Sequence, residues 1–279
     1  MRPSTKLLGW PLLAGLASGC DAPRPFVGFD ALPCLPDAAK HDEDGDGFPD
    51  SCDVCPLVVD PRQLDTSEGE GHAFPDGVGD ECDLLPRSSG DDLVVLHTFA
   101  DPSTSKWEGS GWSIAGDQAS AAGDASWRAI KIEEGDGLVV QLRVASWGPA
   151  GELRVGADGD AMTRGMVCVL ARDREGDGQD ELVVSQFNGE TATKSVPPLG
   201  GDFILMIWRY INGEREGTVR CTLLHADAKY EVSIPAPDAS DGGYVFAATG
   251  IAAISAVAVY TQPVAPCAEP ARCPMPAGD

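Results

Sequence analysis

A run of twelve residues, 42–53, holds the side chains that are best spaced to bind an ion. It reads DEDGDGFPDSCD, with aspartates at positions 1, 3, 5, 9 and 12 and a glycine at position 6. A hard divalent cation takes roughly six to eight oxygen ligands, and alternate side chains of a tight turn can point at one centre. Gly47 permits the bend that brings in the Phe48 carbonyl. We therefore predict a calcium site formed by Asp42, Asp44, Asp46, Phe48, Asp50 and Asp53.

A second acidic run follows at 65–83. Asp76, Asp80 and Asp83 keep positions 5, 9 and 12 of the same spacing, and Val78 takes the carbonyl position 7. Positions 1 and 3 fall on His72 and Phe74, which carry no carboxylate, so Asp65, Glu68 or Glu70 would have to supply oxygens. We predict a second, damaged calcium loop. The alternative is an acidic, disordered linker.

The residues around both loops resemble a known family. DEDGDGFPDSCDVCP, DPRQLDT and DGVGDECD are similar to the thrombospondin type 3 repeat, over roughly residues 36–86. The second loop departs from that pattern, because SEGEGHAFP is inserted before DGVGDECD. The resemblance implies a string of calcium loops at 37–86, stapled by disulfides and without a hydrophobic core. It also implies the pairs Cys34–Cys52 and Cys55–Cys82.

The N-terminus has the parts of an export signal. Arg2 and Lys6 precede a short apolar run, and small residues then lead to Cys20. This end resembles the lipobox of bacterial lipoproteins, although Ala17 stands where leucine is usual. We expect a signal peptide at 1–19, lipidation of Cys20, a tether at 20–36, and a protein anchored by lipid to a bacterial membrane, at the outer membrane, the cell surface or the periplasmic face. The alternative is ordinary cleavage beside an incidental cysteine.

Charge and cysteine content agree with export. The formal net charge is −24, which repels nucleic acid and attracts cations. Of nine cysteines, lipidation of Cys20 leaves eight, enough for four disulfides in an oxidising compartment. We therefore exclude nucleic acid as a partner and expect a membrane, through the lipid, and a glycan or cell-surface protein.

Residues 93–262 alternate apolar and polar residues in short segments, and no convincing amphipathic helix is found. In GLVVQLRVASW, Leu138, Val140, Leu142 and Val144 face one way. DFILMIWRYINGEREGTVRCTLLH predicts two strands joined at Asn-Gly. We predict a mainly β fold: a jelly-roll sandwich preceded by the calcium-loop module.

Two further disulfides are expected. Cys168 lies in phase with Met166 and Leu170, and Cys221 is in phase with its own apolar neighbours, so both point to an apolar face. We predict the pair Cys168–Cys221, with two buried free thiols as the alternative. The proline-rich tail, 263–279, holds the last pair, Cys267–Cys273.

The opening and closing segments of the sandwich, TFADPSTSKWEGSGWSIAGDQASAAG and ISAVAVY, resemble concanavalin-like lectins and glucanases. Glucanases of this fold carry carboxylates at alternating strand positions, and only EGDGQD, with Glu175, Asp177 and Asp180, is comparable. Its glycines predict a hairpin tip, and DREGDGQDE could bind a cation but is more typical of a solvated turn. We therefore expect a non-enzymatic structural or adhesion protein in which calcium rigidifies a stalk. The alternatives are a lectin-like carbohydrate-binding module, with Trp107 and Trp112 as stacking candidates, and a glycoside hydrolase.

Overall fold

The computed structural model describes residues 41–66, 77–83, 92–99, 107–129, 137–157, 165–186, 189–211, 217–226, 228–236 and 244–262. The predicted signal, tether and tail, with Cys20, Cys34, Cys267 and Cys273, lie outside these residues, as do Asp76 and His72. No helix in the described part of the chain is long and apolar enough to cross a membrane.

The described chain is almost entirely β-structure. Its elements are the 3-10 turn η1 (Asp50–Cys52) and the strands β1 (Asp92–His97), β2 (Trp107–Ala115), β3 (Gln118–Ala129), β4 (Gly137–Ala157), β5 (Met166–Ala171), β6 (Asp180–Gln186), β7 (Thr191–Val196), β8 (Phe203–Ile211), β9 (Gly217–His225), β10 (Ala228–Ala236) and β11 (Tyr244–Gln262). The prediction of a mainly β fold is confirmed.

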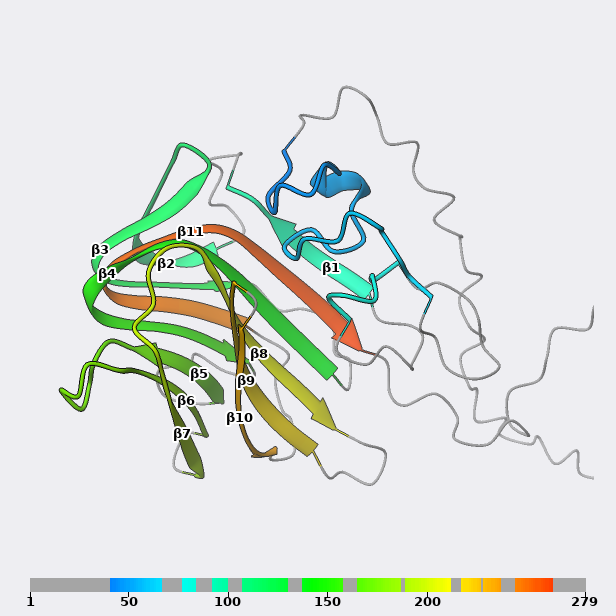
Figure 1. Ribbon diagram of the computed structural model, residues 1–279. Helices are drawn as coiled ribbons and strands as arrows, with labels where there is room; N and C mark the ends of the chain where they lie inside the picture. Colours follow the sequence, from blue (N-terminus) through cyan, green and yellow to red (C-terminus); the bar gives the residue numbers. More distant parts are fainter. Residues whose placement is uncertain are drawn as a thin grey trace, which may run out of the picture.

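The strands form two layers (Figure 1). Sheet 1 has the order β10-β9-β8-β4-β11-β1, and sheet 2 has the order β7-β6-β5-β4-β11-β3-β2. Strands β4 and β11 belong to both, because the first half of β4 pairs with β8 and its second half with β5. All the described pairings are antiparallel. The result is the predicted sandwich, closed along two long bent strands.

Period-two alternation builds the core between the layers. On β8, Phe203, Leu205 and Ile207 face this core, while the residues between them point to the other side of sheet 1. Cys168 on β5 and Cys221 on β9 form a disulfide across the layers, as their phase predicted. Strands β8 and β9 pair from Ile204↔Leu224 to Ile211↔Gly217, as the Asn-Gly signal predicted.

The acidic segment packs on the outer face of sheet 1, the face turned away from sheet 2. We call residues 41–66 and 77–83 the loop module; it lies beside β1 and β11 in Figure 1. Its buried Leu57 and Val78 and its Cys55–Cys82 disulfide share one apolar cluster with Met206, Trp208 and Tyr260, among others, of sheet 1. The module therefore has no core of its own, as predicted. It does not stand off as a stalk, because its buried apolar side chains pack in one cluster with those of the sheet.

Candidate cation site

Loop 42–53 is folded by its own carboxylates. Asp42 accepts hydrogen bonds from the Gly45 nitrogen at 2.8 Å and from the Gly47 nitrogen at 3.0 Å. Asp44 accepts from the Asp46 nitrogen at 3.0 Å. Both glycines have positive φ, 78° and 103°, which glycine adopts without strain. One carboxylate oxygen from each of these three aspartates lies within 4.8 Å of the others. The first three predicted ligands are thus brought together.

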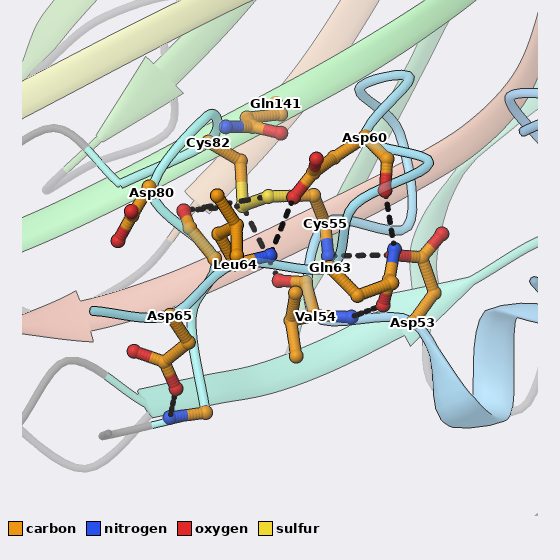
Figure 2. The surroundings of a disulfide bond; sticks show 12 residues. Asp53, Val54, Cys55, Asp60, Gln63, Leu64, Asp65, Asp80, Cys82 and Gln141 are labelled. Atoms are coloured by element: carbon orange, nitrogen blue, oxygen red, sulfur yellow. Dashed lines mark hydrogen bonds between the residues drawn. A yellow bond between two sulfur atoms is a disulfide. The ribbon is translucent and has the colours of Figure 1, made fainter. Parts of the chain in front are cut away.

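The later positions of the loop close it from the other side. Asp50 accepts a hydrogen bond from the Glu43 nitrogen at 2.8 Å and contacts His41 Nδ1 at 2.8 Å. Asp53 accepts from the Cys55 nitrogen at 2.7 Å and from Gln63 Nε2 at 2.8 Å; the Gln63 contact is drawn in Figure 2. Asp50 and Asp53 do not join the close group formed by Asp42, Asp44 and Asp46, so the structure brings together three of the five predicted aspartates.

Two carboxylate oxygens of this loop are buried without a hydrogen-bond partner among the described residues: Asp44 Oδ2 and Asp53 Oδ2. Asp44 is 9% exposed and Asp53 is 8% exposed. Burial, together with the charge of the neighbouring carboxylates, raises the pKa of Asp44 to about 7. Burial also raises the pKa of Asp53. Unpaired buried carboxylate oxygens are costly, and a bound hard cation would satisfy them, so the donor set fits calcium.

The second acidic run is closed by Asp65, one of the three residues considered for that task. Asp65 accepts a hydrogen bond from the Gly77 nitrogen at 2.9 Å, as Asp42 does from Gly47. The Thr66 nitrogen donates to Asp80 at 2.8 Å, as Glu43 does to Asp50. Asp65 therefore takes the place of His72 at position 1. Val78 is buried against sheet 1, and Asp83 is half-buried.

The turn between β5 and β6 repeats the same hydrogen bonds in residues 173–181, which we call the hairpin loop. The Gly178 nitrogen donates to Asp173 at 2.7 Å, the Gln179 nitrogen to Asp177 at 2.9 Å, and the Arg174 nitrogen to Glu181 at 3.0 Å. Unlike loop 42–53, residues 173–178 are exposed, and no buried unpaired oxygen is found in this described segment.

The three carboxylates considered for glycoside hydrolysis do not form a strand-borne set. Glu175 and Asp177 lie at the exposed tip of the hairpin loop. Asp180 is 1% exposed and is held by Arg172 at 2.6 Å and by the Leu199 nitrogen at 2.8 Å. The prediction of a hairpin tip is thus confirmed.

Trp112, a candidate for stacking on sugar, is buried. Trp112 is 9% exposed and packs between Trp127 and Phe246, with ring centroids at 5.9 and 5.3 Å. Its position on β2 turns it into the core, where aromatic burial stabilises the sandwich. The side chain of Trp107 lies outside the described residues.

Sequence reasoning missed the residues by which sheet 1 holds the loop module. Arg143 on β4 donates to the Leu57 carbonyl oxygen at 3.1 Å, and its Nε lies 3.6 Å from Glu43. Tyr260 on β11 is buried under the module. In the sequence, Gln141 and Arg143 alternate with the apolar residues of β4. Polar residues on one side of a strand normally indicate a face in contact with water, so this pattern did not point to a covered face.

Two glutamates lie on the outer face of sheet 2, and one of them, Glu181, is only 2% exposed. Glu152 on β4 and Glu181 on β6 face outward in one row, with Ala171 of β5 between them. Arg154 and Arg174 contact Glu152, and these hydrogen bonds outweigh burial and lower its pKa. Glu181 accepts from two backbone nitrogens of the hairpin loop.

No family model matches the sequence, and no curated protein matches it. Among solved structures, the chain is similar to a glycosyl hydrolase family 16 protein from Mycobacterium smegmatis, with 12% identity over 60% of this chain and 100% of that chain, at a TM-score of 0.44. A Bacillus licheniformis β-glucanase has 10% identity over 60% and 97%, at 0.43. The carbohydrate recognition domain of Emp46p has 8% over 60% and 95%, at 0.44.

These neighbours overturn one expectation. We expected no enzyme, because no strand carries the acid pattern of a glucanase; two of these three neighbours are named as a glycosyl hydrolase and a β-glucanase. The expectation is therefore withdrawn. At 8–12% identity the likeness concerns the concanavalin-like fold alone, and it assigns no activity.

Proposed function

We propose that this protein is an exported, calcium-stabilised β-sandwich whose first cation site is loop 42–53. The proposed ligands are the carboxylates of the five loop aspartates and the Phe48 carbonyl: Asp42, Asp44, Asp46, Phe48, Asp50 and Asp53. The observation that supports this most is the pair of buried, unpaired oxygens on Asp44 and Asp53. Calcium would satisfy them and offset the repulsion between the carboxylates.

The second loop is proposed as a second calcium site of a thrombospondin type 3-like module. Its ligands would be Asp65, Asp76, Asp80 and Asp83, with the Val78 carbonyl. The hydrogen bonds that close it repeat those of the first loop, which supports the assignment of Asp65 to position 1.

The test is calorimetric titration of calcium into the oxidised full chain, compared with two variants. Asp44→Asn removes a buried, unpaired ligand of loop 42–53, whereas Asp177→Asn changes an exposed acid of the hairpin loop. We expect Asp44→Asn to weaken binding at one site at least about tenfold, and Asp177→Asn to leave it unchanged. No calcium uptake by the unsubstituted chain at millimolar concentration would contradict the proposal.

Export and lipidation at Cys20 are proposed on separate grounds. Two disulfides, Cys55–Cys82 and Cys168–Cys221, are consistent with an oxidising compartment. Mass spectrometry of the mature N-terminal peptide should find an acylated Cys20, and Cys20→Ser should remove the acyl mass. An unmodified cysteine at that position in the exported protein would contradict lipidation.

A carbohydrate ligand is our second proposal, for the sandwich rather than the loop module. It is favoured by the names of the similar folds, which are glucanases and a carbohydrate recognition domain. The loop module packs on β4, β8 and β11 of sheet 1. The outer face of sheet 2, with Glu152 and Arg154, is therefore the surface we assign to a long polysaccharide.

Binding of the full chain to a glycan array tests recognition, and release of reducing sugar from β-glucan tests cleavage. We expect Glu152→Gln to reduce whichever signal is found. The matched control is Glu231→Gln, which removes an arginine-paired carboxylate from sheet 1 instead. Absence of both binding and cleavage would contradict the carbohydrate proposal and leave the calcium proposal intact.

A further inference from the structure

Unpaired polar atoms gather where the loop module meets sheet 1. The Tyr260 hydroxyl and Gln141 Oε1 are buried on the sheet side and have no hydrogen-bond partner among the described residues. Tyr260 is 3% exposed and Gln141 is 0% exposed. Asp53 Oδ2 is the unpaired atom on the module side. Figure 2 shows Gln141 beside the Cys55–Cys82 disulfide, with Asp53 on the neighbouring loop.

Tyr260 of the sheet lies in the same buried cluster as Cys55, which follows Asp53 by two residues. Burial raises the pKa of the Tyr260 hydroxyl, and the negative charge of Asp53 raises it further. A neutral tyrosine hydroxyl has one proton to donate, and a carboxylate or a cation-bound water can accept it. Buried polar atoms are rarely left unpaired, so their presence on both sides points to a group between them.

A second link joins the sheet to the same loop. Glu43 stands between Asp42 and Asp44, and its nitrogen donates to Asp50. Its carboxylate lies 3.6 Å from Arg143 Nε and is hydrogen-bonded to Ser255 on β11. Arg143 also donates to the Leu57 carbonyl oxygen at 3.1 Å. The sheet thus holds the backbone that carries the proposed ligands.

We infer that sheet 1 completes the cation site: the Tyr260 hydroxyl and the Arg143–Glu43 pair form the outer shell of a calcium ion bound at 42–53. This inference rests on the proposed calcium site. Outer-shell partners orient ligands, and removing one typically costs about ten- to a hundredfold in metal affinity. Because coupling between two equilibria is reciprocal, calcium must also strengthen docking of the loop module on the sheet.

The first test measures affinity. Tyr260→Phe removes one hydroxyl at the boundary, and Tyr244→Phe is the matched control, since Tyr244 is a buried tyrosine of the core between the sheets. Titration of calcium into each oxidised full chain should show about tenfold weaker binding for Tyr260→Phe. Tyr244→Phe should bind as the unsubstituted protein does.

The second test measures docking in the unsubstituted protein. Cys55–Cys82 joins the two segments of the loop module and packs on sheet 1, whereas Cys168–Cys221 joins the two sheets and serves as an internal control. Calcium should slow reduction of Cys55–Cys82 by dithiothreitol at least several-fold relative to chelator, as read by mass spectrometry of alkylated peptides. The reduction rate of Cys168–Cys221 should change much less.

The outcomes separate the two proposals. If the unsubstituted chain takes up no calcium, the proposed function fails. If it binds calcium, but Tyr260→Phe binds equally well and Cys55–Cys82 is reduced at the same rate with calcium or chelator, then the site is complete within the loop and this inference is wrong. The disulfide measurement needs no substitution, so a Tyr260→Phe protein that fails to fold does not prevent a decision.

Discussion

Loop 42–53 and the hairpin loop 173–181 share three backbone-to-carboxylate hydrogen bonds and differ in their surroundings. In both loops, the glycine nitrogen at position 6 donates to the carboxylate at position 1, and the nitrogen at position 7 donates to the carboxylate at position 5. The nitrogen at position 2 donates to the carboxylate at position 9. In loop 42–53, Asp44 and Asp53 are buried and each keeps an oxygen without a hydrogen-bond partner among the described residues. The hairpin loop keeps Asp173 and Asp177 in water.

The comparison teaches that an acidic loop motif specifies a backbone path rather than an ion. Water can satisfy the hairpin carboxylates, so their hydrogen bonds explain the turn without a cation. Burial of Asp44 and Asp53 removes that water and creates the need for a ligand in loop 42–53. Experiments that change one loop and leave the other intact test this difference.

The largest expected effect is loss of a disulfide. Replacing Cys55 and Cys82 together by alanine should lower the free energy of unfolding by about 3–4 kcal/mol, because the bond closes a loop of 27 residues. Urea denaturation measures this change. Calcium affinity should also fall, whereas the Cys168/Cys221 double variant should lose stability but keep its affinity. Equal effects on affinity would contradict a special tie between the first disulfide and loop 42–53.

Calcium itself should have the next largest effect. At a hundredfold excess over the dissociation constant, a ligand that binds only the folded state adds about 2.7 kcal/mol. The melting temperature should therefore rise by several degrees in calcium relative to chelator. Asp44→Asn should abolish most of this rise, and Asp177→Asn should preserve it. If the melting temperature does not respond to calcium, the proposed difference in calcium binding between the two loops is wrong.

The pH dependence of the chelated protein should follow Asp44. Its pKa is raised in the folded state from 3.8 to about 7, so the folded protein binds more protons than the unfolded chain in that range. Stability in chelator should therefore fall between about pH 4 and pH 7, and Asp44→Asn should flatten the curve. Thermal melts from pH 4 to 8 measure this change in stability. If the contribution of Asp44 makes the protein more stable as the pH rises, the raised pKa of Asp44 is wrong.

The smallest effect belongs to the hairpin loop. Asp177→Asn should change the free energy of unfolding by no more than about 0.5 kcal/mol, with or without calcium, because an exposed turn residue has few contacts to lose. The backbone nitrogen of Gln179 would still donate a hydrogen bond, now to the amide oxygen of the substituted side chain. A calcium-dependent loss of stability in this variant would show that the hairpin loop binds the ion as well.

Much of the fold could be predicted from local patterns. Alternation placed Leu138, Val140 and Leu142 on one face, and the structure puts them in the core between the sheets. The same reasoning paired Cys168 with Cys221. It did not decide between stacking on sugar and burial for Trp112, because the neighbour that covers this residue, Phe246, lies far away in the sequence.

The sequence by itself determined the acidic loops, their glycines and the alternation of the strands, because these depend on contacts within a few residues. Only the tertiary structure decided that the loop module packs on sheet 1, with Arg143 and Tyr260 beneath it, and that Asp65 closes the second loop. These contacts join residues far apart in the chain. Their energy comes from shared burial of apolar side chains, which no local pattern records.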